Sequence, residues 1–239
     1  MGKKEGVAEI KGTLYIVSTP IGNLKDITHR SLELLNDVEL IAAEDTRRTG
    51  KLLKYYDVKA HLESFNSYNQ TKKTDHLIAR LQAGHNLALV SDAGTPGISD
   101  PLYHLVRAAL AACLQVVSLP GPSSVLAALT VSGLPVNRFV FEGFLPRKKG
   151  RKKLIEELAK EKRTIVLFES PHRITKTLNE LYQAMGMRQA VLARELTKIH
   201  EEVIRGTLES LANISVEKKL KGEITLVISG LPKDCNREN

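Results

Sequence analysis

The sequence has 239 residues, of which 42% are hydrophobic, and it carries a net charge of +8. Its mean hydropathy of −0.16 and the lack of an apolar run of about 20 residues argue against a membrane-spanning helix, and the N-terminal segment lacks the apolar centre of a signal peptide. We therefore expect a soluble, cytoplasmic protein of one or two domains.

Strand-like and helix-like segments alternate along the first half of the chain. Apolar runs predict strands at residues 14–17, 38–43, 61–65, 86–90 and 114–119. Between them, helical patterns follow at residues 28–35, 46–56, 69–83 and 102–112. Asp26 or Thr28 is expected to cap the first helix, Gly84 to end the third, and Asp100 with Pro101 to open the fourth.

The second half repeats this rhythm. Helical patterns lie at residues 123–132, 152–162 and 172–185, and strands are expected at 138–144, 164–170, 189–197, 203–208 and 223–229, with a short helix before the last strand. The alternation predicts an α/β protein whose first half is a parallel sheet. Two prolines and a glycine in Ser118–Ser124 indicate the boundary between two α/β domains, residues 12–120 and 121–232, with tails at 1–11 and 233–239.

The familiar nucleotide motifs are absent from this sequence. No two glycines stand two positions apart, so there is no GxGxxG fingerprint, and neither a P-loop nor a GxSxG elbow occurs. The two cysteines, Cys113 and Cys235, form neither a disulfide framework nor a zinc spacing, and no metal site is expected.

Ligands of open α/β sheets bind beyond the carboxyl ends of the strands, so the loops there are the candidates. Five such loops are rich in proline, glycine, serine or charge, at residues 18–23, 43–49, 91–101, 119–124 and 168–173. The third, SDAGTPGISDP, combines prolines that stiffen the backbone with glycines that let a ligand approach it. Asp92 at its start could meet a positively charged group, although a tight turn with an aspartate cap would read the same way.

These loops, in order, resemble the bacterial ribosomal RNA small-subunit methyltransferase I family, which has the tetrapyrrole-methylase fold. The resemblance rests on SDAGTPGISDP together with TPIGNLKDIT, AAEDTRRT, LPGPSS, FESPHR, ARELTKIHEE and KGEITLVI, which span Leu14 to Ile228. It implies two domains, each a sheet flanked by helices, with a cofactor cleft between them, and a homodimer. It also implies methyl transfer from S-adenosyl-L-methionine to the ribose 2′-hydroxyl of a decoding-region cytidine (cytidine 1402) of 16S ribosomal RNA, as naked RNA or in the small ribosomal subunit.

The resemblance also implies a set of cofactor-binding residues. In the loop at residues 91–101, called the signature loop below, they are Asp92, Ala93, Gly94 and Thr95. The others are Ser123 and Ser124 at a helix start, Phe168 and Thr225 at an adenine pocket, and Pro20, Ile21 and Gly22 near the reacting methyl group.

Three departures from the family pattern stand out. Leu102 replaces an expected glycine, and Phe168 replaces an expected tyrosine. Longer members of the family also carry a further small C-terminal domain, which the sequence as given, up to Asn239, does not contain. With Leu102, the position at which the following helix starts is not predicted, and with Phe168 the polar contact of a tyrosine hydroxyl is lost.

Attack by a 2′-hydroxyl calls for alignment of the reacting atoms and for a group that accepts the proton. The candidate catalytic residues are Asp45, Glu169, Glu44 and His172, with Asp100 as a further acid. Glu44 or Asp45 could instead cap the next helix, and Arg173 could bind a phosphate or pair with Glu169.

Almost all of the excess charge lies in one place, the basic segment PRKKGRKK at residues 146–153. Its six cations are Arg147, Lys148, Lys149, Arg151, Lys152 and Lys153, and we expect them, as a mobile loop, to bind RNA phosphates. The alternative is a solvated loop that aids solubility.

Other functions remain open at this stage. They are a small-molecule, tetrapyrrole-type methyltransferase of the same fold, an RNA-binding module without catalysis, and a magnesium-dependent phosphate-ester enzyme, although the acids form no convincing ligand cluster.

Overall fold

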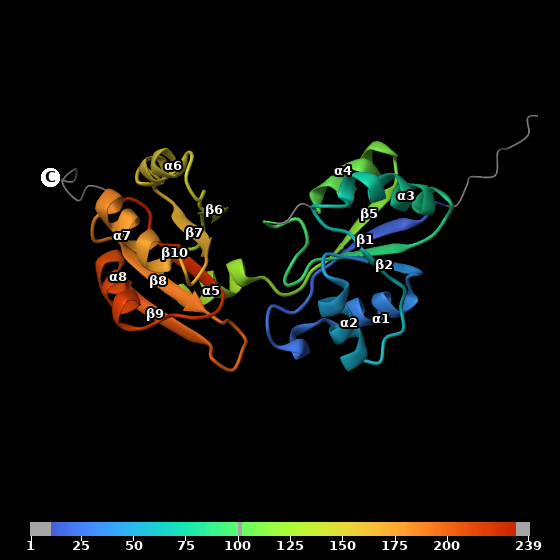
Figure 1. Cartoon of the computed structure of the whole chain (residues 1–239), viewed down its shortest axis with the longest axis horizontal. Coiled ribbons are helices and arrows are strands. Elements are labelled where there is room, and N and C mark those ends of the chain that lie inside the picture. The colour runs from blue at the N-terminus through green and yellow to red at the C-terminus, as the bar shows by residue number, and fades with distance from the viewer. Residues whose placement is uncertain (1–10, 100–101, 233–239) are drawn as a thin grey trace, which may run out of the picture. The chain divides into compact units, whose positions relative to one another are not determined.

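The computed structural model describes residues 11–99 and 102–232 of the chain. The chain divides into two compact units between Ser123 and Ser124, at the end of the Ser118–Ser124 stretch; residues up to Ser123 form unit 1 and the rest unit 2. Each unit consists of a five-stranded sheet flanked by helices, so the α/β prediction is confirmed (Figure 1). No helix in the described ranges is long and apolar enough to span a bilayer.

Unit 1 contains a sheet in which every pair of neighbouring strands is parallel, as the alternation predicted. The strand order is β3-β2-β4-β1-β5. The strands are β1 (Thr13–Val17), β2 (Leu40–Ala43), β3 (Leu62–Ser64), β4 (Leu87–Val90) and β5 (Gln115–Leu119). The helices are α1 (His29–Asp37), α2 (Thr46–Tyr55), α3 (Gln70–Gln82) and α4 (Tyr103–Ala111), with a 3₁₀ turn at Leu24–Asp26.

Both faces of this sheet are buried, which explains its continuous apolar strands. Alternate residues of a strand point to opposite faces. Leu40 and Ala42 of β2 therefore pack in the cluster that contains residues of α3 and α4, and Ile41 and Ala43 pack in the one that contains residues of α1 and α2. Figure 1 shows the two helix pairs on opposite sides of the sheet.

Local signals set the helix boundaries in unit 1. The hydroxyl of Thr28, not Asp26, caps α1 by accepting a hydrogen bond from the Ser31 N–H. Gly84 follows α3 with a φ of 95°, a conformation that suits glycine. Leu102, in place of the expected glycine, is fully buried in the cluster beneath α3 and α4, and α4 begins at Tyr103. Asp100 and Pro101, expected to open this helix, lie outside the described residues.

Unit 2 has a mixed sheet with the order β6-β7-β10-β8-β9, in which only β6 and β7 are parallel. The strands are β6 (Phe139–Phe144), β7 (Thr164–Glu169), β8 (Gln189–Arg194), β9 (Glu202–Thr207) and β10 (Ile224–Ile228). The helices are α5 (Ser124–Ser132), α6 (Arg151–Leu158), α7 (Ile174–Met185) and α8 (Leu208–Glu217).

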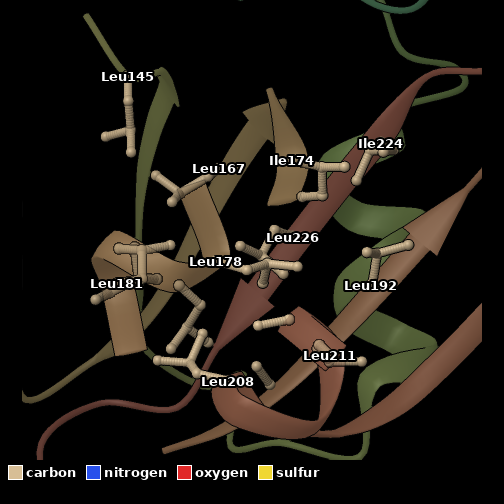
Figure 2. Packing of buried hydrophobic residues seen from close by; sticks show 14 of the residues in the cluster. Leu145, Leu167, Ile174, Leu178, Leu181, Leu192, Leu208, Leu211, Ile224 and Leu226 are labelled. Atoms are coloured by element: carbon tan, nitrogen blue, oxygen red, sulfur yellow. The ribbon is translucent and has the colours of Figure 1, made fainter. Parts of the chain in front are cut away.

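The core of unit 2 lies on one face of this sheet. Leu167, Leu192 and Leu226 of three adjacent strands share one cluster with leucines and isoleucines of α6, α7 and α8. Figure 2 labels the residues of α7 and α8 in this cluster. The alternate residues Phe168 and Thr225 therefore lie on the other face.

The expectation that the whole basic segment is a loop is wrong. Helix α6 begins at Arg151, so that Arg151, Lys152 and Lys153 form its first turn. Gly150, with a φ of 82°, supplies the sharp bend that leads into the helix.

Candidate active site

In unit 1 the loops that follow β1, β2, β4 and β5 share one edge, because parallel strands bring their carboxyl ends together. The loops after β1 and β4 are joined by two reciprocal backbone hydrogen bonds, from Thr19 N to Gly94 O (2.9 Å) and from Gly94 N to Thr19 O (3.0 Å). The hydroxyls of Ser18 and Thr95 lie 2.8 Å apart, and the Thr19 hydroxyl donates to Ser91 O at 3.2 Å. The signature loop is therefore held in one shape by the strand next to its own.

Two glycines allow these loops to approach closely. Gly94 has a φ of +80°, which costs about 1–2 kcal/mol for a residue with a side chain. A Cβ on Gly94 would lie 3.5 Å from the Ile21 side chain, and one on Gly121 would lie 2.9 Å from the Cβ of Ser18. Ile21, Gly94 and the turn after β5 are thus neighbours at this end of the unit 1 sheet.

Asp92 joins two strand ends within the protein. Its Oδ1 accepts a hydrogen bond from the Asp45 N–H (3.0 Å), its own N–H donates to Oε2 of Glu44 (3.2 Å), and Arg48 Nη1 lies 3.3 Å from its Oδ2. The expectation that its carboxylate is available to a positive ligand group therefore needs correction, because a protein cation already faces it. The neighbouring Ala93 is exposed.

Asp45 is the N-cap of α2, the structural alternative considered for it. Its Oδ1 accepts from the Arg47 N–H (2.9 Å) and Nε (3.0 Å), and Arg47 Nη2 lies 2.7 Å from its Oδ2. The Arg47 side-chain and backbone hydrogen bonds hold the pKa of Asp45 well below its ordinary value. Asp45 therefore stays ionised and is a weak proton acceptor.

In unit 2, Phe168 and Thr225 are directly opposite each other on β7 and β10. The Phe168 ring lies against two other rings, with centroid distances of 5.0 Å to Phe141 and 5.6 Å to Phe144. Thr225 is 5% exposed, and within the described residues its hydroxyl makes no hydrogen bond. This pair offers an aromatic surface beside a hydroxyl group. Ser124, another predicted cofactor residue, is the first residue of α5.

Glu169 is a structural carboxylate, contrary to its candidacy as a catalytic base. Its side chain is 1% exposed; Oε1 accepts from the Ser170 N–H (2.7 Å), and Oε2 accepts from the Thr177 hydroxyl (2.6 Å). Arg173 lies 3.3 Å from Oε2 and also donates to Leu145 O at 2.7 Å. Arg173 therefore serves this buried group, and the phosphate contact expected of it is not supported.

Arg151 also departs from its expected role in binding RNA. It is 6% exposed, its Nε lies 2.7 Å from Glu180 Oε2, and its Nη2 donates to the Thr177 hydroxyl at 2.7 Å. The hydroxyl of Thr177 thus connects Arg151 to Glu169. This buried cation anchors α6 to α7 and is not available to a phosphate.

The other five cations of the basic segment are exposed. Lys152 and Lys153 form i,i+4 ion pairs with Glu156 and Glu157 at 3.9 and 3.8 Å, which are weak at a surface. Within the described residues, Arg147, Lys148 and Lys149 make no ion pair. These three remain as the strongest phosphate-binding candidates.

Two candidate bases remain, Glu44 after β2 and His172 before α7. Glu44 is half-buried beside Asp92, whereas His172 is exposed, and within the described residues its imidazole makes no hydrogen bond. Asp100 and Cys235 lie outside the described residues. Within the described residues, no group of three or more His, Cys, Asp or Glu side chains could hold a metal ion.

Sequence reasoning did not identify Ser18, Thr19 and Thr177. The first two directly follow a strand, in a loop already expected at the site, and this position was the available signal. Thr177 lies inside a helix eight residues beyond Glu169, and no motif marks it.

Comparisons with known proteins agree with this fold. The family described as Tetrapyrrole (Corrin/Porphyrin) Methylases matches residues 13–212. A protein named ribosomal RNA small subunit methyltransferase I, from Synechocystis sp., is 51% identical over 226 residues, covering 93% of this chain and 81% of that protein. Its namesake from Thermotoga maritima is 48% identical over 219 residues, covering 92% and 99%.

Two solved structures show a similar fold. A cobalt precorrin-4 methyltransferase has a TM-score of 0.69 at 19% identity, over 91% of this chain and 94% of that one. Uroporphyrin-III C-methyltransferase from Thermus thermophilus, in complex with S-adenosylhomocysteine, has a TM-score of 0.63 at 19% identity, over 90% and 97%. At such identities the likeness establishes the fold alone.

Removal of the Thr177 hydroxyl tests the buried network. We expect Thr177→Val to lower the free energy of unfolding by about 1–3 kcal/mol, because a buried carboxylate and a buried guanidinium each lose a hydrogen bond. Urea unfolding measures this loss. The control is Thr130→Val in α5, an exposed position whose hydroxyl bonds only its own helix, and equal stabilities of the two variants would contradict the network.

Proposed function

The chain belongs to the ribosomal RNA small subunit methyltransferase I family of the tetrapyrrole methylases, and on this premise we propose that it is a methyltransferase that acts on ribosomal RNA. The observation that carries the proposal is the identity to named relatives across more than nine-tenths of the chain. More finely, we propose S-adenosyl-L-methionine as the methyl donor and the ribose 2′-oxygen of cytidine 1402, in the decoding region of 16S ribosomal RNA, as the acceptor.

The chemistry of the site residues suits this cofactor. The ring of Phe168 can cover an adenine, and the Thr225 hydroxyl beside it can hydrogen-bond a polar edge. The N-terminal end of α5, at Ser124, favours a carboxylate because the helix dipole is positive there. In unit 1 the proposed contacts are the backbone of Asp92, Ala93, Gly94 and Thr95, the side chain of Ile21, and Ser123.

The role proposed for these residues is mainly alignment. When bound, S-adenosylmethionine supplies a methyl group on a positively charged sulfur, and no metal is needed. The pinned loops after β1 and β4 hold their peptide groups in one geometry before the ligand arrives, which reduces the entropy lost on binding. Ile21 adds an apolar wall that excludes water at this edge.

The acceptor oxygen must also lose its proton. Arg47 holds Asp45 ionised, and Glu169 is buried in its bonds to Ser170 and Thr177. We therefore assign proton acceptance to the exposed His172 or to Glu44, whose Oε2 also accepts from the Asp92 N–H. A carboxylate and a neutral imidazole are both side chains that can act as general bases toward a hydroxyl group held within hydrogen-bond distance.

Labelled methyl transfer tests the function directly. We expect methyl-labelled S-adenosylmethionine to label the ribosomal RNA of small ribosomal subunits at one nucleotide. The linkage after that nucleotide should resist alkaline cleavage, because a 2′-O-methyl group removes the attacking hydroxyl. Naked 16S RNA is assayed in parallel. Labelling of a tetrapyrrole but not of RNA would favour a small-molecule methyltransferase. If alkali cleaves the linkage after the labelled nucleotide, the ribose 2′-oxygen is excluded as the acceptor.

Conservative variants separate the candidate bases. Asp45→Asn should leave the single-turnover rate within about a factor of ten, because asparagine caps a helix as well as aspartate does. Either Glu44→Gln or His172→Asn should lower that rate about 10²–10⁴-fold with little change in cofactor affinity. A large loss in Asp45→Asn, with both other variants active, would overturn this assignment.

Salt dependence tests the basic segment. In the double variant Lys148→Glu/Lys149→Glu we expect weaker binding to ribosomal RNA and a plot of log affinity against log salt that is shallower by roughly 0.7–0.9 for each lost contact. The control reverses two exposed lysines of unit 1, Lys54→Glu/Lys59→Glu, and so changes the net charge equally. Equal slopes for the two double variants would favour a segment that only aids solubility.

A further inference from the structure

The loop between β3 and α3, residues 65–69, is held in shape by its own side chains. Oδ1 of Asn69 accepts a hydrogen bond from the Asn66 N–H (2.9 Å), and the side-chain amides of Asn66 and Asn69 both donate to Oγ of Ser64 (3.1 and 3.0 Å). The Tyr68 N–H donates to Oδ1 of Asn66 at 3.1 Å. Tyr68 itself is 97% exposed. The loop therefore presents one aromatic ring to solvent from a backbone that these hydrogen bonds fix.

Two further rings lie at the start of α4. Tyr103, the first residue of this helix, is 47% exposed, and His104 is half-buried beside it. Their ring centroids are 4.0 Å apart and their planes are inclined by 32°, so the two rings lie almost face to face. Tyr103 is thus a second exposed ring, and the neighbouring imidazole supports it.

Both groups of rings lie at the same edge of the unit 1 sheet. Tyr68 follows β3 and Tyr103 follows the loop after β4, and the carboxyl ends of these parallel strands point the same way. Helices α3 and α4 pack on one face of the sheet, where their leucines share a cluster, and Figure 1 shows them side by side. Only β2 lies between β3 and β4, so the two strand ends are about 10 Å apart.

A candidate proton acceptor lies at the end of the strand between them. Glu44 follows β2, and its N–H donates to Val90 O at the end of β4 (3.3 Å). On the other side of β2, the N–H of the fully buried Phe65 donates to Ala43 O (2.7 Å). The ends of β3 and β4 are thus each tied to the end of β2. A ribose that meets Glu44 would have its neighbouring nucleotides within reach of the rings on both sides.

Exposed rings at this place point to nucleobases as the ligand. The sequence is poor in aromatic residues, with six tyrosines, five phenylalanines and no tryptophan, yet two of the tyrosines are exposed at this one edge. Proteins hold unpaired RNA bases by stacking them on aromatic side chains, and every base offers a flat face for this contact. The first turns of α3 and α4, residues 70–73 and 103–106, contain no acidic residue that would repel the RNA backbone. Because the rings occupy separate positions along the edge, they suit successive bases of an unpaired strand.

We propose that Tyr68 and the Tyr103–His104 pair form a stacking platform for unpaired bases that flank the target cytidine. Tyr68 stacks on a base at one side of the cytidine, and Tyr103 stacks on a base at the other side. Both are positioning residues, because they hold the strand so that the ribose 2′-oxygen lies at the end of β2. This inference rests on the proposed action on ribosomal RNA and specifies the form of the substrate, which is an unpaired segment.

A cycle of protein variants and abasic RNAs tests the platform. The probe is a single-stranded oligonucleotide of the decoding region, bound to the full chain in the presence of S-adenosylhomocysteine. Removal of the base that stacks on Tyr68 should weaken binding about 5–150-fold, and Tyr68→Leu should weaken binding of the intact oligonucleotide by a similar factor. In Tyr68→Leu, the loss of that base should have no further effect. Tyr103→Leu should behave in the same way toward a base on the other side of the cytidine.

Rescue and control variants separate stacking from general structure. Tyr68→Phe and Tyr103→Phe keep a ring and should bind RNA almost as well as the unmodified chain does. The matched control is Tyr55→Leu, because Tyr55 is also an exposed tyrosine of unit 1 but ends α2, at the opposite edge of the sheet. Its affinity for RNA should equal that of the unmodified chain. Affinity for S-adenosylhomocysteine should be unchanged in every variant, and a loss in Tyr68→Leu or Tyr103→Leu would contradict the platform.

Other results would also overturn the platform. Additive losses for the variants and for every abasic position would exclude stacking, and so would a failure of the unmodified chain to bind the oligonucleotide. A change of oligomeric state in Tyr68→Leu or Tyr103→Leu, seen by sedimentation, would assign the rings to a protein interface. Methylation of small ribosomal subunits is measured separately. If the unmodified chain methylates no RNA, the proposed function fails, whereas non-additive losses on the oligonucleotide would still support the platform.

Discussion

The reciprocal hydrogen bonds between Thr19 and Gly94 are the constraint on which the candidate site of unit 1 depends. They join the loops after two neighbouring strands, and they require a left-handed residue at position 94. With these loops joined, the turn after β5 can approach only because position 121 lacks a side chain. The loops at this edge are thus fixed relative to one another by backbone contacts within unit 1.

Much of the fold could be predicted from the sequence, because it rests on local patterns. Alternating apolar runs and helical repeats set the element order, and a parallel first sheet followed from strands such as Leu40–Ala43 that are apolar on both faces. The strand-end loops were recognisable from proline and glycine. The antiparallel placement of β10 between β7 and β8 was not predictable in the same way, because it depends on pairings between distant strands.

The site was less predictable than the fold, and charged residues account for the errors. Arg151 looks like its neighbours in PRKKGRKK, yet the turn of α6 directs it toward Glu180 and Thr177. Glu169 and Arg173 stand four residues apart, and the structural pairing considered for them is the one observed. Asp45 likewise took the capping role. The cap and the i,i+4 pair are local patterns that the sequence offered as alternatives, whereas the contacts of Arg151 with Glu180 and Thr177 span more than 25 residues and leave no mark in the local sequence.

Gly222 shows how strongly the β8–β9 loop depends on a distant position. A Cβ at residue 222 would lie 2.2 Å from the carboxyl carbon of Glu195, so the ion-paired carboxylate occupies the space that any larger residue would need. An alanine at 222 would adopt a strained φ near 88° and would push the Glu195 carboxylate aside. The hydrogen bonds that this carboxylate accepts from the Glu223 N–H and from Lys198 would then be lost, so the conformation of the β8–β9 loop, residues 195–201, depends on the absence of a side chain at 222.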